Sequence, residues 1–185
     1  FEALSVLALI GSEVPSIGLG TAVVPTYPRH PGTMAQSALT VQAASGGRLT
    51  LGIGLSHKMV IENMLGMSYD HPADHMADHL SILLPLLRGE SVSYSGTSLS
   101  SSMTLGLPPG IATPDVVVAA LGPRMLALAG AVADGTVTWM TGPKTLAEHI
   151  VPSITAAAAA AGRPAPRVVA ALPVLVTDEP DEARA

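Results

Sequence analysis

Short apolar runs alternate with longer segments of helical periodicity along the chain. The runs are apolar at consecutive positions rather than at every second one, which is typical of strands buried on both faces. We expect five such strands, at Ser16–Pro25, Arg48–Gly54, Asp115–Leu121, Gly135–Met140 and Val168–Val176. Because helical segments separate these runs, the pattern favours an α/β protein with a parallel sheet.

The segments between the runs carry the signals of helices. Apolar residues recur at helical spacing, and glycine or proline marks several of the ends. We expect helices at Thr33–Ser45, Pro72–Arg88, Pro123–Val132 and Lys144–Ala161, and Phe1–Ile10 reads as the middle of another. Pro85 is expected to kink its helix or to mark a boundary.

Two segments depart from this alternation. Residues 55–71 show no regular period. Residues 91–107 are rich in Ser, Thr and Gly. Within the second segment, Val92–Tyr94 and Thr97–Leu99 predict a hairpin around Ser95-Gly96.

A parallel sheet with helices is either an open doubly wound sheet or part of a closed barrel. The phosphate fingerprint of dinucleotide-binding sheets is absent, because Gly52–His57 keeps only its first two glycines. A complete barrel needs eight strands and roughly 250 residues, so residues 1–185 would form a single partial domain lacking about three strands. Both ends also look truncated, since Thr177–Glu182 predicts a helix that is just beginning.

Composition narrows the functions to consider. Hydrophobic residues make up 48% of the chain, charged residues 12%, and the formal net charge is −5. The absence of a basic stripe argues against nucleic-acid binding, and no apolar run reaches the length of a membrane span. Without cysteine there is no thiolate nucleophile or thiolate metal site. These features are compatible with a cytoplasmic protein that acts on a small molecule.

Histidine recurs at every fourth position of one predicted helix, interleaved with aspartate. The residues are Asp70, His71, Asp74, His75, Asp78 and His79. This spacing places neighbours on one helix face and resembles a metal-binding pattern. No further His or acidic cluster closes a site, and aspartate at a helix start suits the helix dipole. We therefore expect a solvated face without a metal, where protonation of imidazoles near about pH 6 adds like charges.

Three segments resemble the luciferase-like monooxygenase superfamily, whose members are (β/α)8 TIM barrels. They are Leu19–Pro31, Ala43–Gly54 and Ala119–Gly130, the last followed by Ala133-Asp134-Gly135. Their order and spacing agree with a strand and its loop, a helix end with the next strand, and a later strand-to-helix turn. The branch that uses coenzyme F420, a deazaflavin, is the most similar. The resemblance would place this chain at about strands 3 to 7 of an incomplete barrel.

The resemblance implies a coenzyme site at the carboxyl ends of the strands, where barrel enzymes place their chemistry. At the first end, Thr21, Ala22, Val23 and Val24 would lie behind the deazaflavin ring. A non-proline cis peptide is expected there, at Thr21–Ala22 or, as second choice, at Ala22–Val23. The alternative is an ordinary buried strand.

At the second strand end, the resemblance implies that Leu55, Ser56 and Val60 line the coenzyme site. The Ser56 hydroxyl is suited to bind a phosphate or a ring edge. His57 is a candidate proton donor near the ring, at a place where a sugar-phosphate relative has a catalytic acidic residue. The alternative for His57 is a solvated loop histidine.

The third strand end contains Leu121, Gly122, Pro123, Arg124 and Met125. A glycine before a helix lets a phosphate approach, and the helix N-terminus favours an anion. Arg124 adds a fixed positive charge, and Pro123 suits the first helical position. Phosphate or ribityl binding follows from the resemblance; a plain strand–helix connection with a surface arginine is the alternative.

Large apolar residues leave two further alternatives open. The methionines Met59, Met64, Met67 and Met76 either line an adaptable apolar substrate pocket or belong to the core. Trp139, at the end of a predicted strand, faces either the mouth of the active site or the core.

The function expected first is hydride transfer between coenzyme F420 and a small organic substrate, by a protein that is a homodimer at full length. An FMN-dependent monooxygenase of the same superfamily is the second hypothesis. A non-catalytic barrel fragment is the third. Relatives carry the acid or base on strands that would precede Phe1, so His57 is the one catalytic candidate.

Overall fold

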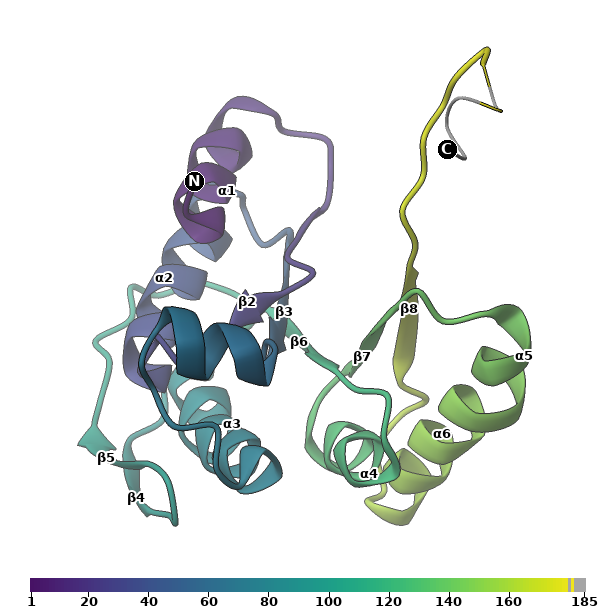
Figure 1. Cartoon of the computed structure of the whole chain (residues 1–185). Coiled ribbons are helices and arrows are strands. Elements are labelled where there is room, and N and C mark those ends of the chain that lie inside the picture. The colour runs from purple at the N-terminus through teal and green to yellow at the C-terminus, as the bar shows by residue number, and fades with distance from the viewer. Residues whose placement is uncertain (180, 182–185) are drawn as a thin grey trace.

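A computed structural model describes residues 1–179 and 181, and it contains one parallel sheet with helices packed along it (Figure 1). The strands of this sheet are β1 (Leu19–Gly20), β2 (Val24–Pro25), β3 (Leu49–Gly54), β6 (Asp115–Ala119), β7 (Gly135–Trp139) and β8 (Arg167–Ala171). The order is β1-β3-β6-β7-β8, with β2 also beside β3, and every pair is parallel. The predicted parallel α/β arrangement is confirmed for this part of the chain.

Helices connect the strands and form a second layer. They are α1 (Ala3–Glu13), α2 (Pro31–Ala44), α3 (Pro72–Leu87), α4 (Pro123–Val132), α5 (Pro143–Thr145) and α6 (Val151–Ala160), with π-helical segments η1 (Val60–Met64) and η2 (Leu146–Ile150). Successive helices pack against each other, as α1 on α2, α2 on α3 and α4 on α6. A separate antiparallel hairpin consists of β4 (Val92–Ser95) and β5 (Ser100–Met103).

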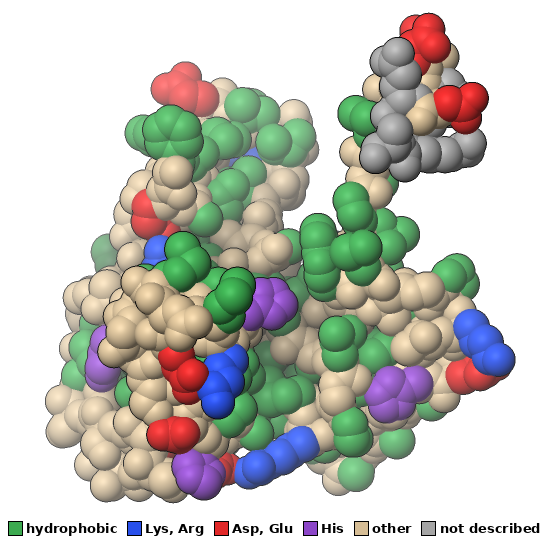
Figure 2. Space-filling model, viewed as in Figure 1, with side chains coloured by type: hydrophobic (Ala, Val, Ile, Leu, Met, Phe, Trp, Pro, Cys, Tyr) green, Lys and Arg blue, Asp and Glu red, His purple; other side chains and the backbone are tan. Residues whose placement is uncertain are grey.

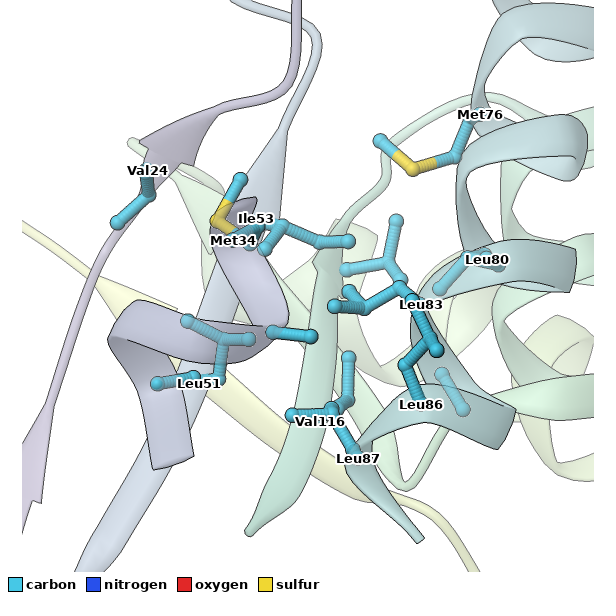
Figure 3. Packing of buried hydrophobic residues seen from close by; sticks show 14 of the residues in the cluster. Val24, Met34, Leu51, Ile53, Met76, Leu80, Leu83, Leu86, Leu87 and Val116 are labelled. Carbon is cyan, nitrogen blue, oxygen red and sulfur yellow. The ribbon is translucent and has the colours of Figure 1, made fainter. Parts of the chain in front are cut away.

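The core lies between the sheet and the helices on its outer face. Leu51 and Ile53 of β3 and Val116 of β6 point toward Met34 of α2 and Leu83 of α3 (Figure 3). All five side chains are at most 1% exposed. Burial of these aliphatic side chains supplies most of the driving force for this packing, since each contributes about 1.5–3 kcal/mol.

The first predicted strand, Ser16–Pro25, is interrupted. Two residues pair before the break and two after it, as β1 and β2. Between them the Thr21 hydroxyl donates to the Gly52 carbonyl at 2.7 Å and accepts from the Gly52 N–H at 2.9 Å. Because a side chain takes the place of main-chain partners, the ladder breaks there. A Cβ atom on Gly52 would lie 1.9 Å from the Thr21 carbonyl oxygen, so only glycine fits opposite the break.

Three other elements differ most clearly from the predictions, and α2 (predicted at Thr33–Ser45) and β6 (predicted at Asp115–Leu121) differ by one or two residues at their ends. Thr97–Leu99, expected as the second hairpin strand, is the turn, because the Asp78 carboxylate accepts from the main-chain N–H groups of Ser98 and Leu99. The last strand ends at Ala171 instead of Val176, as β8 has a partner on one side only. Predicted helix Lys144–Ala161 contains η2, just before Pro152, whose ring nitrogen has no N–H to donate.

The predicted ends of helices α3 and α4 are closer to the structure. Helix α3 passes through Pro85 and ends two residues later, so the proline marks a boundary. The predicted helix Pro123–Val132 has the observed bounds of α4. The helix start expected at Thr177–Glu182 lies partly outside the described residues. No helix in the described part of the chain combines the length and the hydropathy of a membrane span.

Candidate active site

A pocket of about 480 Å³ opens at the carboxyl ends of the strands. Because all six strands of the sheet are parallel, the segments that follow β2, β3, β6 and β7 meet at one edge. The lining comes from the break between β1 and β2, the end of β3 and the loop after it, the end of β6 and the turn after it, and strands β7 and β8: Ala22, Val23, Gly54, Leu55, Ser56, His57, Tyr69, Ala119, Ala120, Leu121, Val137, Thr138, Trp139 and Ala171. The turns near Ala22, Ser56 and Leu121, far apart in sequence, therefore share one cavity.

The break between β1 and β2 forms one wall of this pocket. The peptide bond between Ala22 and Val23 is cis, which confirms the second-choice position and shows the first choice, Thr21–Ala22, to be wrong. Ala22 is exposed to the pocket, whereas the Val23 side chain lies over Gly54. A Cβ atom on Gly54 would be 2.6 Å from Val23 Cγ2, so the glycine is what lets the two strands close in this way.

The turn after β3 forms a second wall. Ser56 has a positive φ of 63°, which directs the chain away from the strand. The Tyr69 hydroxyl donates to the Ser56 carbonyl at 3.2 Å and so ties this turn to the end of the loop. His57 lies exposed on the pocket lining next to this bond.

Tyr69 is the first of three rings that stack on one another and connect the loop to α3. Its ring stacks on Tyr27 with centroids 5.1 Å apart, and Tyr27 stacks on His75 at 4.0 Å. His75 Nε2 lies 3.2 Å from the Thr26 hydroxyl. Burial raises the pKa of Tyr27 to about 12, with Tyr69 and Asp70 adding to the effect, and its buried hydroxyl has no hydrogen-bond partner. The loop wall of the pocket thus rests on α3.

The turn between β6 and α4 forms the third wall. Leu121 lines the pocket, and its carbonyl lies 2.9 Å from His149 Nε2. Gly122 is the N-cap of α4, no side chain caps the first N–H groups, and nothing lies within 4 Å of a Cβ built on Gly122. Arg124 is exposed and forms an ion pair with Asp74.

The structure divides the coenzyme-site residues predicted from the sequence into two groups. Five of them line the pocket, namely Ala22, Val23, Leu55, Ser56 and Leu121, and so does His57. The other seven, Thr21, Val24, Val60, Gly122, Pro123, Arg124 and Met125, are not part of the lining. Thr21 and Val24 are buried behind it, whereas Gly122, Pro123 and Arg124 lie exposed at the start of α4.

Several lining residues escaped the sequence analysis. Ala119 and Ala171 lie at strand ends, so the rule that chemistry gathers there would have found them, whereas Val137 lies in the middle of β7. Tyr69 gives no such signal, because it enters the site from a loop of irregular period. Trp139 lines the pocket and is 58% exposed, so of the two alternatives it faces the mouth of the pocket and not the core. Of the four methionines, Met76 is core, whereas Met59, Met64 and Met67 are exposed.

The expected solvated face is wrong for His75, Asp78 and His79, whereas Asp70 and His71 are exposed. His75, Asp78 and His79 are buried at 6%, 5% and 0% exposure, and they face the interior. Burial lowers the pKa of His79 to about 3, with the nearby His75 ring adding to this and the main chain of Arg29 opposing it. Burial likewise lowers the pKa of His75, against the attraction of Asp78. The expected protonation near pH 6 is therefore suppressed at both.

Asp78 has a structural role instead. Burial raises the pKa of its carboxyl, but hydrogen bonds from the Ser98 N–H, the Tyr94 hydroxyl and the Leu99 N–H outweigh this and lower it overall. The three bonds measure 2.6, 2.8 and 3.0 Å and hold the hairpin β4–β5 to α3. Among the described residues, no group of three or more His, Asp or Glu side chains is placed to hold a metal ion.

Comparisons with known proteins agree with this geometry. The chain is 32% identical over 160 residues to 5,10-methylenetetrahydromethanopterin reductase of Archaeoglobus fulgidus, covering 86% of this chain and 47% of that protein. It is 32% identical over 189 residues to F420-dependent glucose-6-phosphate dehydrogenase of Beutenbergia cavernae, covering 99% and 56%. The chain therefore spans about half the length of the curated relatives it matches.

Solved structures give the same result. The coenzyme F420 dependent tetrahydromethanopterin reductase of Methanopyrus kandleri superposes with a TM-score of 0.80 at 26% identity, over 92% of this chain and 54% of that one. A monooxygenase from Streptomyces bottropensis superposes at 0.84 with 20% identity, over 99% and 57%, and shows the shared fold. The family model described as luciferase-like monooxygenase matches residues 1–185. The chain belongs to the luciferase-like monooxygenase family.

Proposed function

We propose that this chain is the coenzyme-binding part of an F420-dependent oxidoreductase that transfers a hydride to or from a small organic substrate. The observation that carries the proposal is the convergence of three strand ends on one pocket. The F420-dependent glucose-6-phosphate dehydrogenase at 32% identity and the coenzyme F420 dependent reductase structure at 26% identity support the choice of coenzyme. We also propose that the sheet is part of an eight-stranded barrel, as the luciferase-like neighbours suggest. The partial domain at residues 1–185, the homodimer and the cytoplasmic location stay predictions.

The pocket wall suits a flat ring. Ala22, Gly54, Ala119 and Ala171 have small side chains or none, and they come from four different strands or strand ends. A wall of this kind offers apolar contact without projections, as a tricyclic ring requires. A bound deazaflavin would supply the hydride chemistry, and the protein would orient it and exclude water.

The start of α4 suits the phosphate of the coenzyme. Its first N–H groups have no capping side chain, and the space beside Gly122 is open. The partial positive charge of a helix N-terminus favours an anion there. Arg124, two residues on, would strengthen binding if its guanidinium left Asp74, which an exposed ion pair permits at a cost of about 1 kcal/mol or less.

Two side chains of the lining are placed to bind or move a proton. The Ser56 hydroxyl and the His57 ring follow the end of β3, where Tyr69 fixes the main chain. We assign Ser56 to the ring edge and His57 to proton donation near the ring. Leu55 and Val60 would then cover the ring from the loop side, with Thr21 and Val24 holding the opposite wall from behind and Met125 packing under the phosphate turn.

Trp139 provides the test, because it is the only tryptophan of the chain and lines the pocket. Titration of the chain with F420 should quench Trp139 emission and give a saturable curve. The same titration with FMN tests the monooxygenase hypothesis. In Trp139→Phe the coenzyme's own fluorescence should still change on binding. Saturation by FMN without a response to F420 would replace the proposal by the alternative, and no response to either would leave a non-catalytic chain.

A further inference from the structure

Large apolar side chains stand exposed around the pocket mouth. Seven of them follow the carboxyl ends of β3, β6 and β7, namely Met59, Met64, Leu65, Met67, Leu121, Trp139 and Met140. Their exposure ranges from 37% to 74%. Figure 2 shows hydrophobic side chains on both sides of the hollow between the body that contains α1 and α2 and the one that contains β8. We call these seven residues the apolar rim.

Leu121 and Trp139 connect the rim to the pocket, since both are also lining residues. Met59 lies two positions after His57, Met67 lies two before Tyr69, and Met140 follows Trp139 directly. The apolar surface thus continues from the pocket wall onto the loops around it. Exposed apolar surface of this extent marks a binding site for an apolar group.

No Lys or Arg of the described chain contributes to the pocket lining. Arg124 is the cation assigned above to the coenzyme phosphate, and Lys58 and Lys144 form exposed pairs with Glu62 and Glu148 outside the lining. A phosphate or carboxylate on a substrate is normally bound by such a cation, above all by arginine. His57 is the one histidine of the lining.

We propose that the substrate of this site is an uncharged, predominantly apolar organic molecule rather than a phosphorylated or carboxylated one. The inference rests on the proposed function, because the ring of the coenzyme would occupy the small-residue wall and leave the rim to the substrate. Methionine side chains are unbranched and adaptable, so four of them around one mouth accommodate apolar groups of differing shape.

The experiment compares two probes on the coenzyme-loaded chain and on the chain alone. Cyclohexanol is the neutral apolar probe, and glucose-6-phosphate, named for one relative, is the charged one. Because Trp139 belongs to the rim, its emission maximum reports occupancy directly. We expect cyclohexanol to shift the emission saturably and glucose-6-phosphate to leave it unchanged. Tighter binding of glucose-6-phosphate would overturn the inference.

Length-matched polar variants test the rim itself. Met59→Gln and Met140→Gln should each weaken cyclohexanol binding roughly threefold to tenfold, by the apolar contact they remove. Neither residue lines the coenzyme pocket, so the affinity for F420 should stay within about twofold. Leu9→Gln is the control, since Leu9 is 70% exposed on α1 and belongs neither to the rim nor to the pocket lining. Unchanged cyclohexanol affinity in both methionine variants would contradict the inference.

The outcomes separate this inference from the proposed function. If F420 binds and glucose-6-phosphate shifts the emission maximum of Trp139, the proposed substrate class is wrong and the coenzyme assignment stands. If F420 fails to bind while cyclohexanol binding depends on Met59, the coenzyme assignment fails and the apolar site stands. Sedimentation of the same variants tests whether a second copy of the chain binds to the rim. If the methionine substitutions change self-association but not cyclohexanol binding, the rim is an interface between chains and the inference is overturned.

Discussion

The two halves of helix α3 bury opposite kinds of side chain, aliphatic in one half and polar in the other. The C-terminal half buries Leu80, Leu83 and Leu87 against the aliphatic face of the sheet (Figure 3). The N-terminal half buries His75 and His79 instead, together with Asp78. One half therefore holds the fold together, whereas the other ties the hairpin and the Tyr27–Tyr69 loop wall into place. Burial alone does not separate a stabilising role from an organising one; the partners of each side chain do.

Truncation in the aliphatic half should have the largest effect. Leu83→Ala removes a fully buried side chain from the centre of the cluster, so we expect it to lower the free energy of unfolding by about 2–5 kcal/mol. Chemical denaturation monitored by circular dichroism measures this loss. Ser81→Ala on the exposed side of the same turn is the control, and a similar loss there would show that the loss in Leu83→Ala does not come from core packing.

Removing a hydrogen-bond acceptor from the polar half should lower the free energy of unfolding by somewhat less, and the effect should be seen in the hairpin β4–β5. Asp78→Ala removes one acceptor and leaves the N–H groups of Ser98 and Leu99 without it, so we expect a loss of about 2–3 kcal/mol. Hydrogen exchange at residues 96–99 should rise in this variant. The matched control is Asp74→Ala, which breaks an exposed pair with Arg124 at a cost of about 0–1 kcal/mol. Equal losses in the two variants would remove the distinction between the halves.

The acid stability of the polar half follows from His79. In the unfolded chain His79 has an ordinary pKa of 6.5, whereas burial in the folded chain lowers it to about 3. The unfolded state therefore binds the proton first, so stability is full above pH 6.5 and falls as the pH drops below it. At about pH 5 the loss should be on the order of 2 kcal/mol.

The variant His79→Leu checks that slope. It should flatten the dependence of the unfolding free energy on pH between about 4 and 6.5, leaving a smaller slope from His75, whose pKa is also lowered. His71→Leu is the control, because its side chain is exposed. Denaturation curves at a series of pH values give the measurement, and a slope that survives intact in His79→Leu would assign the acid lability to another group.

The same helix shows what the sequence could and could not reveal. Helical spacing found α3 and its leucines, and the family resemblance, together with the rule that barrel chemistry lies at strand ends, found Ala22, Ser56 and Leu121. The pattern of histidines and aspartates failed, because the residues that bury them, Thr26 and Tyr27 from the loop after β2 and Ser98 from the hairpin turn, are distant in sequence. Polar residues at helical spacing indicate a face, but tertiary partners decide whether that face meets water.

The smallest expected effect concerns the link between α3 and the pocket, the Tyr27–Tyr69 stack. Tyr69→Phe keeps the ring but removes the hydroxyl that donates to the Ser56 carbonyl, which should cost about 0.5–1.5 kcal/mol and loosen the Ser56–His57 turn. Tyr27→Phe is a matched control, because the hydroxyl it removes is buried without a partner, and its loss should be neutral or slightly stabilising. Thermal unfolding should separate the two variants in sign. Trp139 quenching by F420 should weaken several-fold in Tyr69→Phe alone. If both variants weakened it equally, the hydrogen bond from Tyr69 to the Ser56 carbonyl would not be what holds the turn.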